Sequence, residues 1–366
     1  MHKSLMTALL LTAAPLLPGT AIAQDNPAAE IASAAQAYLD TLDRDQLGAA
    51  MLPFPSTAVP AQAEFSRSGG GGGGRPASNF TGERYGASVW SNYPASDVLR
   101  PGLPLGDMTE EQRAAAMALL QAALSPEGYA KVQQIIASDQ ALHEGGTNYA
   151  SGTDAYVLGI FGTPSEDGNW MMQFGAHHLG LNLVIRGGDG TLTPTMTGAQ
   201  PAQYTDAEGN AVRVLADEND KAFALLDSLT EDQRAKAVLG YEVNDLVYGP
   251  GATGAPMMPE GLQGSDMTEE QQALMIDIIS EWAGIVTEDW AAPRLDQLRA
   301  DLDETWFAWS GPLTHEDGRN GSSYYRIQGP RLVIEFSPQG VGGDPTNHVH
   351  TVYRDPTNAY GLGTAQ

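Results

Sequence analysis

The stretch Gly168–Gly187, GNWMMQFGAHHLGLNLVIRG, decides the fold and the candidate site of this 366-residue chain. Two mostly apolar runs within it, Asn169–Phe174 and Leu179–Arg186, predict strands, because runs of this length rich in large and branched apolar residues suit a sheet. His177 and His178 lie between the runs, and the whole chain has only seven histidines. A histidine pair beside two strands marks a candidate functional site.

Only one histidine of this pair is expected to face a shared site if the segment is extended, because successive side chains of a strand point to opposite faces. His178 adjoins the apolar strand and ranks slightly above His177 as the residue that faces the site. Both alternatives remain open from the sequence.

A second pair, His348 and His350, lies near the other end of the chain in TNHVHTVYRDP. On a strand over His348–Tyr353 the two imidazoles lie on one face, about 7 Å apart. Both can bind one ion at that spacing, because metal–nitrogen bonds are about 2 Å long. We therefore predict that folding brings the two pairs together in a metal site made of His348, His350 and one or both histidines of the first pair.

Glu335, in the expected strand Leu332–Phe336, is the candidate for a fourth ligand. Nitrogen and oxygen ligands without sulfur suit zinc, iron, manganese or copper(II), so the expected cofactor is a divalent transition metal. The alternative is that the paired histidines are buried and only form hydrogen bonds. The sequence leaves these two interpretations open.

Four further polar residues are candidates for binding a small ligand: Gln173, Tyr325, Arg326 and Arg354. The two arginines suit a carboxylate or a phosphate, because the planar guanidinium donates two parallel hydrogen bonds to such groups. We therefore expect a small acidic ligand. The alternative for Arg354 is an ion pair with the adjacent Asp355, which would fix the last turn of the chain.

The strand predictions form two groups with helices between them. The first group is Ala155–Phe161, Asn169–Phe174 and Leu179–Arg186, and the second is Thr305–Trp309, Ser323–Gln328, Leu332–Phe336 and His348–Tyr353. Short loops rich in Gly, Pro, Asn and Asp separate the strands of each group, as in antiparallel hairpins. This order predicts an α+β fold, with a mostly antiparallel sheet or sandwich and helices packed outside.

Three expected helices begin with one signature, at Thr109, Thr230 and Thr268. In each, the threonine caps the helix and a glutamine occupies the third helical position, while the acidic residues between them favour the positive end of the helix dipole. We interpret the three as independent capping boxes rather than as an internal repeat. Further helices are expected in Pro27–Met51, after Ser125 and after Thr287.

The composition excludes several classes of protein. The formal net charge is -26, so binding to nucleic acid or to an anionic membrane surface is not expected. The absence of cysteine excludes disulfides, thiolate metal ligands, iron–sulfur clusters and a cysteine nucleophile. The chain has no Gly-x-Ser-x-Gly elbow, and its glycine tracts lack the strand–helix context of a dinucleotide site, so these two classes find no support.

Residues 1–23 are predicted to be a signal peptide. The segment has a basic start, the apolar run Leu5–Leu17, and the small-x-small pattern Ala21–Ala23 that precedes a cleavage point. Its removal leaves one expected α+β domain, 24–366, with a flexible glycine-rich loop at 66–76 and no membrane anchor. The expected location is periplasmic or secreted.

Four segments are distinctive in combination: WMMQFGAHHLGLN (Trp170–Asn182), GAQPA (Gly198–Ala202), SYYRIQGPRLVIEF (Ser323–Phe336) and NHVHTVYRDPTNAYG (Asn347–Gly361). Together they resemble the bacterial family catalogued as Domain of Unknown Function 3500, over most of the chain from about Ala34 onward. The chain departs from the family pattern in QFGAHH, where a second glycine is expected, and in NAYG, where an acidic residue is expected before the tyrosine. Neither change affects a histidine. The family name implies no activity, so the resemblance supports the location of the site and not a reaction.

These features predict an exported, soluble protein with a histidine-rich metal site, of a kind that suits a metal-dependent hydrolase or oxidoreductase acting on a small acidic substrate. The rival prediction is a non-catalytic periplasmic ligand-binding protein whose histidines only form hydrogen bonds. A small molecule is the expected partner in both.

The signal peptide leads to a prediction about processing. Protein recovered from the exporting cell is expected to begin at Gln24, as the free residue or cyclised, because cleavage follows the small-x-small pattern. Mass spectrometry of the intact mature protein measures this end. A mature fraction that retains Met1, or lacks only Met1, would contradict export.

Overall fold

The computed structural model describes residues 26–55, 59–66, 79–150, 152–255 and 258–363. The expected signal peptide and the six-glycine tract Gly69–Gly74 lie outside the described residues, so both remain predictions.

The helices and strands have the following bounds. The helices are α1 (Pro27–Asp40), α2 (Arg44–Ala50), α3 (Glu110–Ala123), α4 (Pro126–Glu144), α5 (Ala216–Ser228), α6 (Glu231–Ala237), α7 (Glu269–Ala283) and α8 (Glu288–Ala300). The strands of the main sheet are β1 (Met51–Leu52), β5 (Leu103–Pro104), β6 (Val157–Phe161), β7 (Asn169–Ala176), β8 (Leu179–Arg186), β9 (Asp189–Thr191), β10 (Thr195–Ala199), β13 (Leu262–Gln263), β14 (Trp306–Ser310), β15 (Tyr324–Gly329), β16 (Leu332–Pro338) and β17 (Val349–Arg354). The remaining strands are β2 (Ala61–Ser66), β3 (Asn79–Tyr85), β4 (Ser88–Trp90), β11 (Gln203–Thr205) and β12 (Ala211–Arg213).

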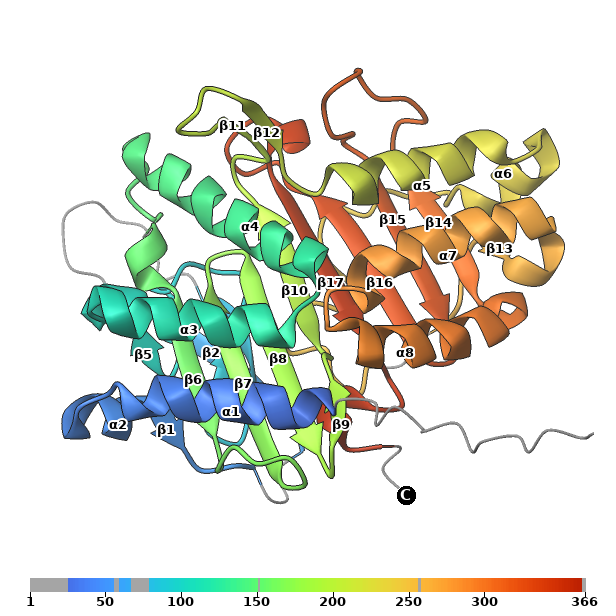
Figure 1. Cartoon of the computed structure of the whole chain (residues 1–366). Helices are drawn as coiled ribbons and strands as arrows, with labels where there is room; N and C mark the ends of the chain where they lie inside the picture. The colour runs from blue at the N-terminus through green and yellow to red at the C-terminus, as the bar shows by residue number, and fades with distance from the viewer. Residues whose placement is uncertain (1–25, 56–58, 67–78, 151, 256–257, 364–366) are drawn as a thin grey trace, which may run out of the picture.

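The fold is built on one 12-stranded sheet whose front face is covered by helices (Figure 1). The strand order is β1-β6-β7-β8-β10-β17-β16-β15-β14-β13, with β5 paired to β6 and β9 to β8. Only the β1–β6 pairing of this sheet is parallel. The predicted α+β class and mostly antiparallel sheet are therefore confirmed, while the arrangement is not clearly a sandwich.

The other face of the main sheet is covered by the three-stranded sheet β2–β3–β4. Trp90, at the end of β4, packs with Met196 and Val352 on this face. Its ring also lies against Gly180, where an added Cβ would come within 3.0 Å of it. The candidate site lies on this side of the sheet, away from the helices.

The predicted strands agree closely with the structure. All seven are present, with ends shifted by at most two residues. The sequence did not predict β10, which has the polar sequence TMTGA, or α5, whose first turn is polar and whose N-terminus has no side-chain cap. The three predicted capping boxes are confirmed, because each threonine accepts a hydrogen bond from the third helical N–H and each glutamine accepts one from the cap.

The boxes at Thr109 and Thr268 belong to an internal repeat, which corrects the interpretation of these two as independent. Gly102–Gln112 reads GLPLGDMTEEQ and Gly261–Gln271 reads GLQGSDMTEEQ, so the last six residues are identical. Each segment forms a short strand, a single 3-10 turn and a capped helix, and each strand pairs with the first long strand of its own half of the sheet.

The two halves of the sheet are arranged about its centre. From the central pair outward, the order β10-β8-β7-β6 in one half matches β17-β16-β15-β14 in the other. At the centre Thr197 lies opposite Thr351, and their hydroxyls are 2.7 Å apart. The halves thus meet through one antiparallel strand pair, in a pseudo-two-fold arrangement.

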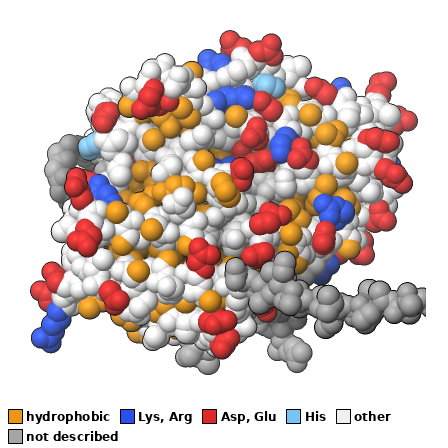
Figure 2. All heavy atoms as spheres, viewed as in Figure 1, with side chains coloured by type: hydrophobic (Ala, Val, Ile, Leu, Met, Phe, Trp, Pro, Cys, Tyr) orange, Lys and Arg blue, Asp and Glu red, His pale blue; other side chains and the backbone are white. Residues whose placement is uncertain are grey.

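The surface is acidic without a concentrated patch on the helical face. In Figure 2 the Asp and Glu side chains are spread over the helices, consistent with a solvated surface. Within the described part of the chain, no helix combines the length and the apolar character needed to cross a membrane.

Two glycine substitutions test the repeated turn. Gly261→Ala is expected to lower the free energy of unfolding by more than about 2 kcal/mol, because φ is +99° and the new Cβ would lie 2.1 Å from the carbonyl oxygen of Phe307. Gly48→Ala, within α2 and with nothing within 4 Å of the added carbon, is expected to raise it by about 0.5–1 kcal/mol. Urea unfolding followed by circular dichroism compares the two, and similar small effects would contradict the close approach at Gly261.

Candidate metal centre

The first histidine pair forms the tight turn of the β7–β8 hairpin. Because β7 ends at Ala176 and β8 begins at Leu179, the two turn residues are His177 and His178 themselves. His178 has φ of 61°, in the left-handed region that favours glycine. A side chain with a Cβ costs about 1–2 kcal/mol there, so the turn holds this imidazole at the expense of stability.

The second pair lies where β17 begins. The side chains of Val349 and Tyr353 belong to the core beneath the helices, and Thr351 accepts a hydrogen bond from Trp282 of α7. His350 lies on the opposite face, as strand alternation predicts. Gly198 of β10 is paired with His350, and an added Cβ there would lie 3.3 Å from the Cβ of His178. A small residue in the intervening strand therefore lets the two histidine segments approach.

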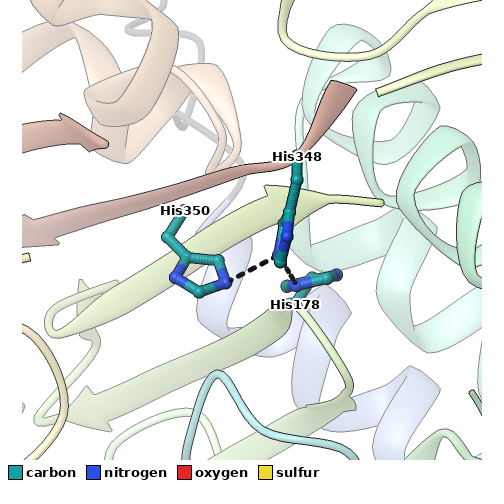
Figure 3. Close-up of side chains that lie close together, drawn as sticks. All are labelled: His178, His348 and His350. Atoms are coloured by element: carbon teal, nitrogen blue, oxygen red, sulfur yellow. Dashed lines mark hydrogen bonds between the residues drawn. The ribbon is translucent and has the colours of Figure 1, made fainter. Parts of the chain in front are cut away.

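Three imidazoles converge at this point (Figure 3). The Nε2 atom of His348 lies 3.0 Å from Nε2 of His178 and 3.1 Å from Nε2 of His350. All three side chains are buried, and their ligand atoms lie within 4.8 Å of one another. Nitrogen ligands about 2 Å from one ion are about 3 Å apart, so the group can hold a metal ion. The predicted meeting of the two histidine pairs is confirmed by this geometry.

Hydrogen bonds at the outer ring nitrogens fix the orientation of two imidazoles. Nδ1 of His348 lies 2.8 Å from the carbonyl oxygen of Val341. Since a carbonyl only accepts, the proton is on Nδ1 and Nε2 presents its lone pair to the centre. Nδ1 of His350 lies 3.2 Å from the side-chain amide of Asn92 and 3.6 Å from Oδ1 of Asp245. Such outer contacts orient the rings of metal ligands.

Burial keeps these histidines uncharged. Desolvation, reinforced by the neighbouring His350, lowers the pKa of His348 to about 3. Desolvation and the three adjacent imidazoles lower the pKa of His178 well below its ordinary value, and desolvation also lowers the pKa of His350. All three are therefore neutral at pH 7, which is the protonation state that binds a metal.

His177 lies beside the three-histidine group and not within it. Its Nδ1 is 2.7 Å from Oδ1 of Asp139 on α4, and its ring stacks on His178 with centroids 3.7 Å apart. The other oxygen of Asp139 accepts the backbone N–H of Gly152. His177 therefore connects the turn to a helix, and of the first pair His178 is the one that joins His348 and His350.

The second half of the chain has a matching contact. Asp139 follows the α4 cap Ser125 by 14 positions (139 - 125), and Asp301 follows the α8 cap Thr287 by the same number (301 - 287). Asp301 forms a two-point ion pair with Arg331, in the turn between β15 and β16. The carboxylate-to-turn contact thus recurs in both halves, which indicates that the Asp139–His177 pair positions the hairpin.

A cavity of about 310 Å³ opens onto the three histidines. Its walls include Phe80 of β3 and the loop residues Asn92, Tyr149, Gln200 and Asp245. Sequence reasoning missed all of them, because single residues from separate segments carry no periodic signal. Asp139 did have a signal: it is an acidic residue at the helical spacing of the buried Val132, Ile135 and Ile136 of α4.

The structure does not bring the other predicted site residues to this cavity. Glu335 lies two positions from Ser337, the partner of His350 in the sheet, but its carboxylate accepts hydrogen bonds from the backbone of Val247 and Tyr248 and from the Tyr324 hydroxyl. It is therefore not part of the three-histidine group.

The four predicted ligand-binding residues are also engaged elsewhere. Gln173 donates to Asn182 within the sheet, and the Tyr325 hydroxyl donates to a backbone carbonyl of α5. Arg326 pairs with Glu260, and Arg354 pairs with Glu83 rather than with its neighbour Asp355. None of the four lines the cavity at the histidines.

Comparison with known proteins identifies the family. A family model described as a protein of unknown function, DUF3500, matches residues 78–362. The chain belongs to the DUF3500 family. The match includes all three convergent histidines and every strand of the main DUF3500 sheet except β1. Searches of curated proteins and of solved structures give no significant match.

The strained turn leads to a prediction. His178→Gly is expected to be more stable than His178→Ala by about 1 kcal/mol, because both remove the imidazole and only glycine is unstrained at a φ of 61°. At His143, in the last turn of α4, the order is expected to reverse, since alanine favours a helix over glycine by up to about 1 kcal/mol. Thermal unfolding of the four variants gives the two differences, and the same order at both positions would contradict the strain.

Proposed function

We propose that the protein binds one divalent transition-metal ion through Nε2 of His178, His348 and His350, and that the ion serves a reaction in the adjoining cavity. The observation that carries this is the convergence of three buried imidazole nitrogens, two of them 3.0 and 3.1 Å from the third.

The rival explanation, that the histidines only hydrogen-bond to one another, accounts for fewer of the nitrogen atoms. Nε2 of His348 is unprotonated and has one lone pair, so it accepts well from only one of His178 and His350. Nε2 of the other histidine is then left without a good partner. An unsatisfied buried polar atom costs about 1–3 kcal/mol. A single ion satisfies all three lone pairs, and neutral imidazoles are the form that binds it.

The number of protein ligands favours a catalytic over a structural ion. Structural zinc sites use four protein ligands, whereas catalytic sites use three and leave a position for water or substrate. The group here has three members among the described residues, and the cavity lies beside them. An ion in this setting lowers the pKa of bound water or polarises a substrate oxygen. Zinc would suit a hydrolase, and iron or copper(II) would suit an oxidoreductase.

We also propose that the protein is exported and works outside the cytoplasm. The support is the basic, apolar and small-x-small pattern of residues 1–23. A metal ion held by histidines alone also suits an oxidising compartment, because it needs no thiolate ligand.

Metal analysis tests the proposed centre. Untagged protein, stripped with a chelator and dialysed against zinc or cobalt(II), is expected to hold about one equivalent of ion. His178→Ala, His348→Ala and His350→Ala are each expected to weaken binding by about 100-fold or more. His143→Ala, outside the group and exposed, is the matched control and is expected to bind as the wild type does.

The outcomes separate the two functions. Circular dichroism close to wild type in the three site variants would assign the loss to the ligands. Less than about a tenth of an equivalent in the wild type after reconstitution, with every metal tried, would favour the non-catalytic ligand-binding protein.

A further inference from the structure

The cavity beside the three histidines has no cationic lining. Among the described residues that form its wall, none is Lys or Arg, whereas two are acidic, Asp97 and Asp245. Arg100 lies close behind, but its guanidinium donates to backbone carbonyls that include those of Ser91, Tyr93 and Ala176. The wall of the cavity therefore offers no positively charged side chain to a carboxylate or a phosphate.

The polar atoms that face the cavity are mostly acceptors. The amide nitrogen of Gln339 donates to Asp245 and to Ser337, so its carbonyl oxygen is the atom left for a ligand. Asp245 also contributes carboxylate oxygens, and its side chain is 59% exposed. Gln200, whose oxygen accepts from the Tyr149 hydroxyl, has an amide nitrogen left to donate.

Aromatic rings form the apolar part of the wall. Phe80 and Tyr93 pack edge to face with centroids 5.0 Å apart, and Tyr149 packs edge-on against His177. Flat rings beside a set of amide and carboxylate oxygens suit a compact molecule that has an apolar face and many hydroxyl groups at its rim.

We propose that this cavity takes an uncharged, hydroxyl-rich molecule of monosaccharide size and discriminates against anions. The inference rests on the proposed function in that the bound molecule would lie beside the ion, but the cavity wall is independent of the ion. It replaces the acidic ligand expected from the sequence, because the two arginines that suggested it are paired with Glu260 and Glu83. Hydroxyl groups supply the donors that the acceptor-rich wall lacks.

Three probes with one ring skeleton test the charge preference: glucose, glucuronate and glucosamine. Binding to the chelator-stripped full chain is measured by saturation-transfer NMR titration, and then repeated on the zinc-treated protein. Glucose is expected to bind the stripped protein about tenfold more tightly than glucuronate, the effect of one carboxylate about 6 Å from another at intermediate dielectric. Glucosamine is expected to exceed glucose by no more than about tenfold, because the same carboxylate attracts its ammonium group.

A charge variant isolates the residue responsible. Asp245→Asn is expected to reduce the difference between glucose and glucuronate to about twofold or less, because it removes the carboxylate and keeps the shape. Glu111→Gln, which removes an exposed charge at the start of α3, is the matched control and is expected to leave the difference unchanged.

Three other outcomes of the sugar titrations overturn the proposal. Glucuronate binding the stripped protein as tightly as glucose would assign an acidic ligand, and glucosamine binding it more than about tenfold more tightly than glucose would assign a cationic one. No binding of any probe to the stripped or the zinc-treated protein would remove the hydroxyl-rich ligand altogether. Failure of zinc uptake with sugar binding intact would overturn the proposed metal centre alone, so the two failures are distinguishable.

Discussion

The antiparallel pairing of β10 with β17 is the constraint on which both the fold and the site depend. It joins the two halves of the sheet and fixes which residues of each half lie opposite one another. A slip of one residue would turn every side chain of β17 to the other face. His350 would then enter the core beneath α7, and Val349 would take its place. The hydroxyl contact between Thr197 and Thr351 and the bond from Trp282 both favour the observed register.

Buried charges hold the segments that close the site over the sheet. Glu83 of β3 forms an ion pair with Arg354 of β17 and accepts a hydrogen bond from Tyr360. Glu335 accepts two backbone N–H groups from the loop after α6, and burial raises the pKa of this carboxyl. Charges this deep are tolerated only when paired or fully hydrogen-bonded. Their role here is to fix irregular chain against a regular sheet, and Glu335 and Arg354 therefore serve structure where the sequence suggested ligands.

What the sequence could predict was set by periodicity and by rarity. The strands around His177 and His350 were predictable because their apolar runs are long and their neighbours are turn residues. The histidine site was predictable because four of the seven histidines occur in two pairs. The partner of Glu335 or Arg354 was not predictable, since tertiary structure selects it from 45 acidic and 19 basic side chains. The turn at His178 was not predictable either, because a histidine at positive φ contradicts local preference and is maintained by the surrounding packing.

The repeat has a consequence for the number of centres. The first half of the chain contributes His178 and the second contributes His348 and His350, so neither half holds a complete set. Two identical halves about the same axis would create two equal centres on one molecule. In the other half of the sheet, Arg331 occupies the position that corresponds to His178, and it pairs with Asp301. Met196 occupies the position that corresponds to His350, and it packs against Trp90. The strand order is the same in both halves of the sheet, and a few side chains restrict the chemistry to one side of it.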